Sequence, residues 1–140
     1  TTPTLPAPLT VTGDARVTLY VSSDAPDTDF MVRLCDVDEA GRSVKLADGI
    51  LAARFRNGFS APEYLEPGKV EKLVIRTSKI SHCFLPGHRL RVSVTSGAKH
   101  FVFPNSNTKD AYNSTESRVA HNTVWHGGAA PSHILLHVER

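Results

Sequence analysis

The chain has 140 residues, 40% of them hydrophobic and 21% charged, and its formal net charge is +2. A chain of this length forms one domain and buries roughly two-thirds of its unfolded surface. The basic residues are scattered, and no apolar run approaches the roughly 18 residues of a membrane helix. We therefore expect neither nucleic acid nor a membrane as a partner.

The first segment, residues 1–13, is rich in Pro and Thr (TTPTLPAPLTVTG) and lacks the charged and apolar regions of a signal peptide. We expect it to be a linker or entry segment that leads into a domain covering residues 14–140. Met31 is the only methionine. This observation favours a piece of a longer protein.

Short alternating runs follow, and their period of two indicates strands with one face turned inward. Such runs occupy residues 17–21 and 30–34. The DEAG segment at 38–41 predicts a turn. Asp48-Gly49 predicts a hairpin turn between SVKLA and ILAARFR.

The second half of the chain continues the same pattern. Alternation returns at residues 72–76 and 90–94, and Pro86-Gly87 predicts a turn before the latter run. The polar stretch at 104–118 is loop by composition.

Two further strands are expected at residues 119–126 and 133–138. The total is about eight or nine strands with a turn signal roughly every ten residues, too closely spaced for crossover helices. The pattern predicts an all-β fold: an antiparallel β-sandwich of the jelly-roll type, similar to galactose-binding domains.

A catalytic serine is not predicted. The GRSVK string at 41–45 lacks the second glycine of a nucleophile elbow, and the HGG string at 126–128 is typical of a turn. Residues 78–82 supply serine and histidine letters, and Asp36 or Asp38 an acid, but a triad is defined by geometry and any chain of this size contains these letters.

The seven histidines raise the question of a metal site. His133 and His137 share a face of one expected strand, but positions four apart on a strand lie roughly 13 Å from each other. His121 and His126 fall on opposite faces. We therefore expect neither a metal nor another cofactor.

Aromatic side chains leave open the alternative of a stand-alone carbohydrate-binding module. Such modules stack sugar rings on aromatic platforms, yet no two candidates are spaced as a platform. The candidates are Trp125, Tyr20, Tyr64 and Tyr112.

The only cysteines are Cys35 and Cys83, and they form no CxxC pair. Each lies in an apolar run, which is typical of buried or half-buried free thiols, although the sequence leaves a bridge between them open. Free thiols favour a reducing compartment, so we expect a cytoplasmic protein.

Ordered landmarks along nearly the whole chain resemble the C-terminal jelly-roll domain of the X-prolyl dipeptidyl peptidase and cocaine esterase (CocE/NonD) family of serine hydrolases. In chain order they are TG at 12–13, SSDAPDTDF at 22–30, DGIL at 48–51, LEPG at 65–68, FLPGHRLR at 84–91, NSNT at 105–108 and PS at 131–132.

The resemblance implies a three-part hydrolase of ester or peptide bonds, with an α/β-hydrolase domain, a helical cap and this sandwich at the end. The catalytic triad of such enzymes lies in the α/β part, so nothing catalytic carries over to this chain. The implied role is to complete the parent fold and shape substrate access, with the hydrolase and cap domains as partners and a homo-oligomer left open. The GAKHFVFP segment at 97–104 departs from the Ser and Phe-Pro-Arg of relatives.

The turn before residues 90–94 supplies the candidates for charged contacts. His88 and Arg89 enter the strand there, and a guanidinium on an aspartate of a neighbouring turn would join two turns by charge-assisted bonds. We expect Arg89→Ala to lower the melting temperature. The candidate turn or interface residues are His88, Arg89, Asp36, Asp38 and Asn105.

Overall fold

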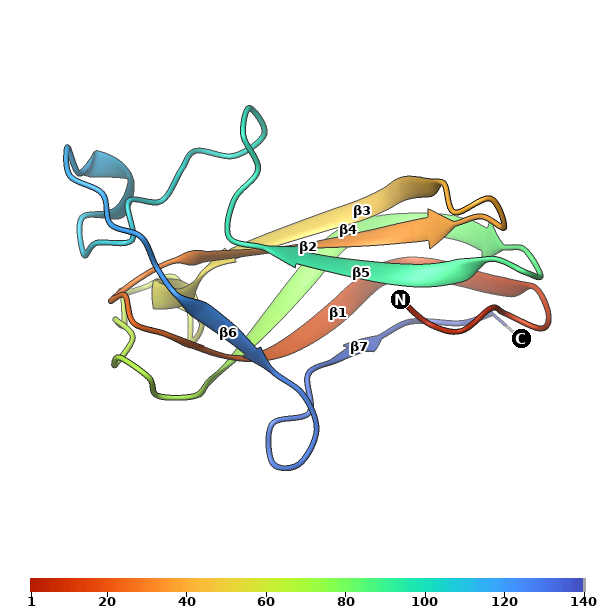
Figure 1. Ribbon diagram of the computed structural model, residues 1–140, viewed down its shortest axis with the longest axis horizontal. Coiled ribbons are helices and arrows are strands. Elements are labelled where there is room, and N and C mark those ends of the chain that lie inside the picture. The colour runs from red at the N-terminus through yellow and green to blue at the C-terminus, as the bar shows by residue number, and fades with distance from the viewer. Residues whose placement is uncertain (140) are drawn as a thin grey trace.

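The computed structural model describes residues 1–139, which form two antiparallel sheets packed face to face (Figure 1). The strands within these residues are β1 (Leu9–Ser23), β2 (Asp29–Val37), β3 (Ser43–Ala52), β4 (Glu71–Phe84), β5 (Arg89–Thr95), β6 (Asn122–Trp125) and β7 (His133–Leu135). Two short 3-10 helices, η1 (Ala53–Phe55) and η2 (Ala111–Asn113), lie between strands.

One sheet has the order β4-β1-β6, with β7 also paired to β1, and the other has the order β3-β2-β5. Every pairing in these two sheets is antiparallel. The predicted all-β sandwich is therefore confirmed. Neither 3-10 helix is long or apolar enough to cross a membrane.

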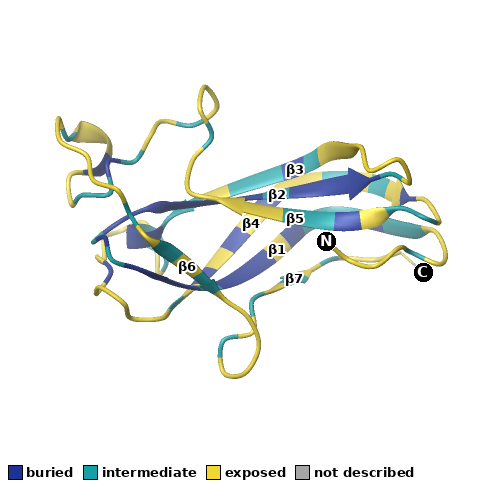
Figure 2. Cartoon of the chain, viewed as in Figure 1, coloured by how far each residue is buried: buried dark blue, intermediate teal, exposed yellow. Residues whose placement is uncertain are grey.

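The core lies between β1 and β2, which are the most completely buried strands (Figure 2). Val17, Leu19 and Val21 turn inward from β1, and Phe30 and Val32 meet them from β2. The period-two prediction for both runs is confirmed. Burial of such side chains stabilises the fold by about 1.5–3 kcal/mol each.

The predicted hairpin turn at Asp48-Gly49 is wrong, because both residues lie inside β3. A Cβ on Gly49 would lie 2.4 Å from the carbonyl oxygen of Arg76 in β4. The absence of a side chain at Gly49 therefore allows the two sheets to approach each other closely. Asp48 Oδ1 accepts a hydrogen bond from Arg33 Nε at 2.7 Å, so it has a strand contact of its own.

Gly49→Ala is expected to destabilise the domain by about 1–3 kcal/mol, because a backbone carbonyl cannot move aside for the added methyl group. Chemical denaturation measures the loss. Gly97→Ala is the matched control, since nothing lies within 4 Å of a Cβ there and its φ is not positive. Equal stability of the two variants would contradict the close-packing role.

The first residues are not a free linker. β1 begins at Leu9, so the last residues of the expected linker or entry segment, 9–13, belong to a strand. Upstream, Thr2 N donates to Leu90 O at 2.9 Å, and Leu5 N donates to His88 O at 2.8 Å. Residues 1–5, here called the N-terminal arm, therefore lie along β5.

The last two strands are shorter than expected, and the described residues hold seven strands where eight or nine were predicted. β6 has four residues and β7 three. Gly127 and Gly128, both with positive φ, turn the chain between them. His121 and His126 therefore fall just outside β6, and His137 lies beyond β7.

Candidate functional site

Asp36, near the end of β2, holds two histidines. Its Oδ2 accepts a hydrogen bond from His82 Nε2 of β4 at 2.9 Å, and its Oδ1 accepts one from His88 Nδ1 at 2.8 Å. Asp36 is 8% exposed. The cluster joins strands of the two sheets through one buried carboxylate. The predicted turn is present as well, since Gly87 has a φ of 82°.

Arg89 does not make the expected ion pair. Its side chain is exposed, and no salt bridge within residues 1–139 includes it. Successive side chains of a strand point to opposite faces, and Leu90 beside it faces the core. Asp38 instead accepts bonds from Arg42 N and Nε within its own turn. The carboxylate contact belongs to His88.

The His82–Asp36 pair does not complete a catalytic triad. Both carboxylate oxygens are taken by histidines, and neither Ser78 nor Ser81 is hydrogen-bonded to His82 in the described part of the chain. Within the same residues, no group of three or more His, Cys, Asp or Glu side chains is placed to hold a metal.

Asp36→Ala is expected to cost about 1–3 kcal/mol, because two half-buried imidazoles lose their acceptor. Arg89→Ala is expected to leave the melting temperature unchanged, which corrects the sequence-based expectation for that residue. Thermal denaturation of both variants compares them directly. A larger loss from Arg89→Ala than from Asp36→Ala would contradict this assignment.

A second polar cluster lies at the other end of β2, around two buried carboxylates. Asp27 is fully buried and Asp29 is 1% exposed. Asn105 Nδ2 donates to Asp27 Oδ2 at 2.7 Å and to Asp29 Oδ1 at 2.8 Å. The side chain of Asn105 thereby fixes the start of the 104–118 loop to the sandwich, and the candidate from the sequence lies at the centre of this cluster.

Arg54 of η1 supplies the positive charge of the cluster. Its backbone N donates to Asp27 Oδ1 at 2.9 Å and its Nε donates to Asp27 Oδ2 at 2.8 Å. Its Nη2 donates to the carbonyl oxygen of Thr108 at 3.0 Å. One buried guanidinium therefore contacts both the turn that precedes β2 and the 104–118 loop.

Tyr112 of η2 completes the cluster. Its hydroxyl donates to Asp29, with the two carboxylate oxygens at 3.0 and 2.9 Å. Burial raises the pKa of Asp29, the bonds from Asn105 and Tyr112 offset part of that rise, and the charge of Asp27 adds to it. Burial and the neighbouring Asp29 raise the pKa of Tyr112 well above its usual value.

Asp29→Asn is expected to change how stability depends on pH. The raised pKa means that the folded state takes up the Asp29 proton at higher pH than the unfolded state. The contribution of Asp29 to stability is therefore present at low pH and lost as pH rises through the folded pKa. Urea unfolding should show the native-minus-variant difference growing from about pH 7 to about pH 4.

Asp24→Asn is the control with the opposite sign. Hydrogen bonds from His121 lower the pKa of Asp24, so its contribution is lost as pH falls. A native-minus-Asp29→Asn difference that shrinks on acidification, as expected for Asp24, would contradict the raised pKa that burial gives Asp29.

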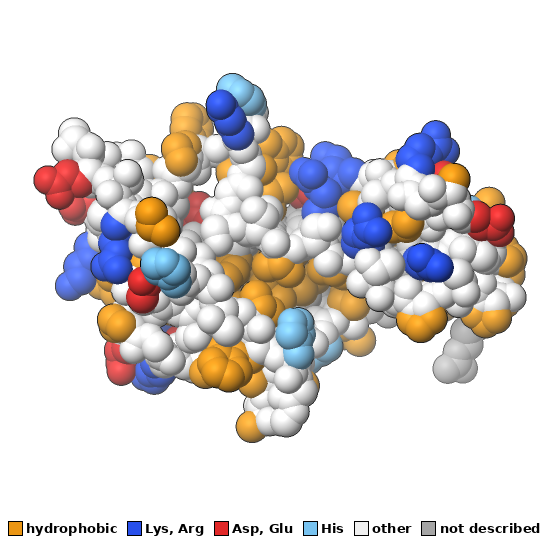
Figure 3. Space-filling model, viewed as in Figure 1, with side chains coloured by type: hydrophobic (Ala, Val, Ile, Leu, Met, Phe, Trp, Pro, Cys, Tyr) orange, Lys and Arg blue, Asp and Glu red, His pale blue; other side chains and the backbone are white. Residues whose placement is uncertain are grey.

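The residues just before the 104–118 loop carry exposed aromatic side chains. Phe101 is 58% exposed and Phe103 is 85% exposed. With Ile50 and Tyr112 they border a cavity of about 490 Å³. In Figure 3, hydrophobic side chains flank the Lys and His side chains at the tip of the loop. Residues 101–103 therefore form an apolar projection, which we call the aromatic loop.

The backbone of this region is also unusual. All three non-glycine residues with positive φ in residues 1–139 lie here: His100, Asn107 and Ala111. A positive φ is costly for such residues and persists only where surrounding contacts impose it. Near Asn107 and Ala111, the bonds of Asn105, Arg54 and Tyr112 supply such contacts.

The aromatic candidates for sugar binding are separated. Trp125 Nε1 donates to Ser22 Oγ at 3.0 Å, and Tyr64 contacts the cations of Arg54 and Lys109. Tyr112 is 51% exposed, and its hydroxyl is bonded to Asp29. They form no stacking pair with one another among the described residues.

Sequence reasoning missed Arg54, Tyr112 as a donor and His82 as a ligand of Asp36. Each contact joins residues far apart in the chain, by 27, 83 and 46 positions respectively. No local pattern marks such a pair. The two thiols are free as predicted, although Cys83 is exposed and only Cys35 is buried.

The fold and the two clusters define the class as a β-sandwich whose internal charged groups hold its own strands and loops in place. A family model described as the X-Pro dipeptidyl-peptidase C-terminal non-catalytic domain matches residues 1–135, and the chain belongs to this family. The resemblance found from the sequence is confirmed, and the carbohydrate-binding alternative is not supported.

Known relatives are much longer than this chain. It is 38% identical over 138 residues to the cocaine esterase of Rhodococcus sp. (strain MB1 Bresler), which covers 96% of the chain and 24% of the esterase. An aminopeptidase from a marine sediment Thaumarchaeota archaeon superposes with a TM-score of 0.93 at 29% identity, over 99% of the chain and 25% of that enzyme.

An α-amino acid ester hydrolase superposes with a TM-score of 0.92 at 27% identity, over 98% of the chain and 24% of that hydrolase. The chain thus spans about a quarter of the length of the relatives it matches.

Proposed function

We propose that this domain is the C-terminal part of a longer serine hydrolase of ester or peptide bonds, where it completes the fold and shapes access to the substrate. Support comes from the family match over residues 1–135. The named relatives are an esterase, an aminopeptidase and an ester hydrolase, each about four times as long as this chain. The partners in this proposal are the α/β-hydrolase and cap domains of the parent.

The observation that carries the access role is the aromatic loop on its buried base. Exposed phenylalanines are costly in water and are typical of a surface that meets a partner or ligand. Here two bonds from Asn105 to buried carboxylates fix the base of the loop. A rigid base under an apolar projection suits a wall that excludes water and contacts an apolar acyl or side-chain group.

The cellular compartment of the parent is also a proposal. Two unpaired thiols in one small domain support a reducing compartment, and therefore the cytoplasm.

Phe103→Ala in the full-length parent tests the access role. Phe103 is 85% exposed in this domain, so its removal is expected to leave the melting temperature of the parent unchanged. KM for esters with bulky apolar acyl groups should rise several-fold, while KM for acetyl esters changes little. Leu85→Ala, an exposed apolar truncation in the β4–β5 turn, is the matched control and should change neither KM.

Equal KM values for Phe103→Ala and Leu85→Ala with bulky esters would contradict the access role. It would leave the family assignment in place, because that assignment rests on residues 1–135 as a whole.

A further inference from the structure

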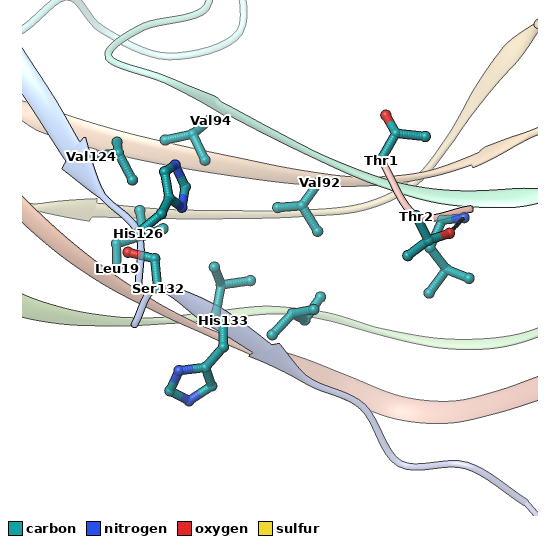
Figure 4. Close-up of a pocket in the computed structure, with 12 residues that line it drawn as sticks. Thr1, Thr2, Leu19, Val92, Val94, Val124, His126, Ser132 and His133 are labelled. Carbon is teal, nitrogen blue, oxygen red and sulfur yellow. Dashed lines mark hydrogen bonds between the residues drawn. The ribbon is translucent and has the colours of Figure 1, made fainter. Parts of the chain in front are cut away.

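The two sheets meet closely on one side of the sandwich and separate on the other. Gly49 of β3 lies against the backbone of β4 on the closed side. On the side of β5, a cleft of about 330 Å³ opens between the sheets (Figure 4). Apolar side chains of both sheets line it: Val17, Leu19, Val92, Val94, Val124 and Ile134.

The floor of this cleft is formed by the hydrophobic core, although Val17 and Leu19 are themselves only 3% exposed. Val17 and Leu19 belong to the main core cluster, and Val92, Val124 and Ile134 pack against that cluster. Hydrophobic side chains are visible within the hollow between the two ends of the molecule in Figure 3. An apolar cleft that reaches the core indicates that a further apolar element covers it.

The outer edge of β5 offers backbone groups to such an element. β5 is the last strand of its sheet and pairs only with β2. Leu90 O accepts from Thr2 N, and Leu90 N donates to Thr2 Oγ1 at 3.1 Å, so the peptide groups of Leu90 point away from β2. The period of two places those of Val92 and Val94 on the same outer edge, where no strand lies among residues 1–139.

The N-terminal arm already runs along this edge. Leu5 N donates to His88 O and Thr2 N donates to Leu90 O, so residue numbers decrease along the arm as they increase along β5. The arm is therefore antiparallel to β5. Residues upstream of Thr1, continued in the same direction, lead to Val92 and Val94 and over the cleft.

We propose that the segment of the parent chain immediately before Thr1 forms a further strand, antiparallel to β5, whose apolar side chains fill the cleft. It would bring the sheet of β3, β2 and β5 to four strands, the number that the other sheet has among the described residues, and two four-stranded sheets are the usual arrangement of a jelly roll. The first residue before Thr1 lies opposite Val92 and the third lies opposite Val94. These two residues face the cleft and are apolar.

Family membership and the position of the N-terminal arm together identify the segment that would fill the cleft. The family places this domain at the C-terminal end of longer proteins, and the chain matches only about a quarter of its relatives. Upstream residues therefore enter the domain through Thr1, at the rim of the cleft. The proposal rests on family membership and not on the access role of the aromatic loop.

Hydrogen–deuterium exchange of the full-length parent and of the 140-residue chain tests the strand. The amides of Val92 and Val94 should exchange more than about tenfold more slowly in the parent than in the chain. The amides of Arg91 and Ser93, which face β2, are the internal controls and should be protected in the parent. Fast exchange at Val92 and Val94 beside a protected Ser93 in the parent would overturn the proposal.

A second copy of the chain is the competing occupant. Protection of Val92 and Val94 in the 140-residue chain that increases with protein concentration would assign the edge to self-association and would also overturn the proposal.

A disulfide in the parent tests the register without any need for the chain to fold alone. Val94→Cys is combined with a cysteine at the third residue before Thr1, which should lie about 5.5 Å away between Cα atoms, within reach of a disulfide. The matched control places that cysteine at the second residue before Thr1, whose side chain faces the other way. Non-reducing peptide mapping should find the first bridge and not the second; absence of both in folded parent contradicts the proposed register and strand.

Discussion

Arg54→Met is expected to lower the free energy of unfolding by about 3–5 kcal/mol and the melting temperature by roughly 10 °C or more. The reason is the carboxylate that the substitution leaves behind. Asp27 is fully buried, and Arg54 satisfies it through a charge-assisted bond at 2.8 Å. Methionine fills a similar volume but leaves Asp27 without its counter-charge in a site that water does not reach.

Arg42→Met is the matched control for this loss. Arg42 also pairs with an aspartate, at 3.1 Å, but its side chain is 79% exposed. An ion pair in water contributes little to stability. Denaturant unfolding of both variants should therefore separate them clearly, and similar losses would show that burial of the Arg54 pair is not what stabilises this end of the domain.

Asn105→Ala is expected to cost about 3 kcal/mol, because two hydrogen bonds to charged carboxylates are lost at once. Asn105 donates to Asp27 and Asp29, and without it two buried carboxylates lie close together with fewer donors. Its Oδ1 also accepts from Asn107 N at 2.9 Å, so the loop turn is weakened as well. Proteolysis within 104–118 should be faster in this variant, which gives a local measure of loop release.

Asn57→Ala is the control, since Asn57 Nδ2 also donates to a carboxylate, that of Glu63, but at an exposed site. The same chemical change should there cost little. A stable Asn105→Ala variant with an unchanged proteolysis rate would contradict the role of the buried cluster in holding the loop.

The sheets and most of the core are predictable from the sequence because strand burial has a short period. Alternation at 17–21 and 30–34 identifies the inward faces of β1 and β2, and both faces are found in the core. The turn at 38–41 is equally local, and its backbone bond from Gly41 N to Asp38 O is present. Such features depend on neighbours in sequence.

The failed prediction at Asp48-Gly49 results from contact between distant segments, whereas the one at Arg89 has a local cause. Asp48-Gly49 has the composition of a hairpin turn, yet a glycine is needed at position 49 because the backbone carbonyl of Arg76, in the other sheet, leaves no room for a Cβ. A glycine within an alternating run can also indicate close backbone approach, and this was the available signal. Its charge favours Arg89 as the partner of a carboxylate, whereas strand alternation places its side chain outward.

The candidate site was predictable only in part. The resemblance to a family loop identifies Asn105 as a candidate residue. The structure places its amide between two buried carboxylates that lie 78 and 76 positions away in the sequence. The partnership with Arg54 and Tyr112 depends on how η1 and η2 pack, which no local pattern encodes. The sequence could therefore name a residue but not the cluster that gives it a role.

The two clusters have complementary consequences for the parent. The Asp36 cluster fixes the strand ends beside the N-terminal arm. The Asp27 and Asp29 cluster fixes the aromatic loop at the other end. Internal charges in this domain thus determine where its surfaces lie, which is the property a supporting domain contributes to an enzyme.

The central claim is that this domain supports a hydrolase whose bond-breaking groups lie in the rest of the parent. Turnover of an activated ester, measured side by side for the purified 140-residue chain and the full-length parent, tests it most directly. We predict turnover by the parent that a serine-directed reagent abolishes, and none above buffer by the chain. Sustained turnover by the chain alone, retained through repeated purification, would contradict the claim.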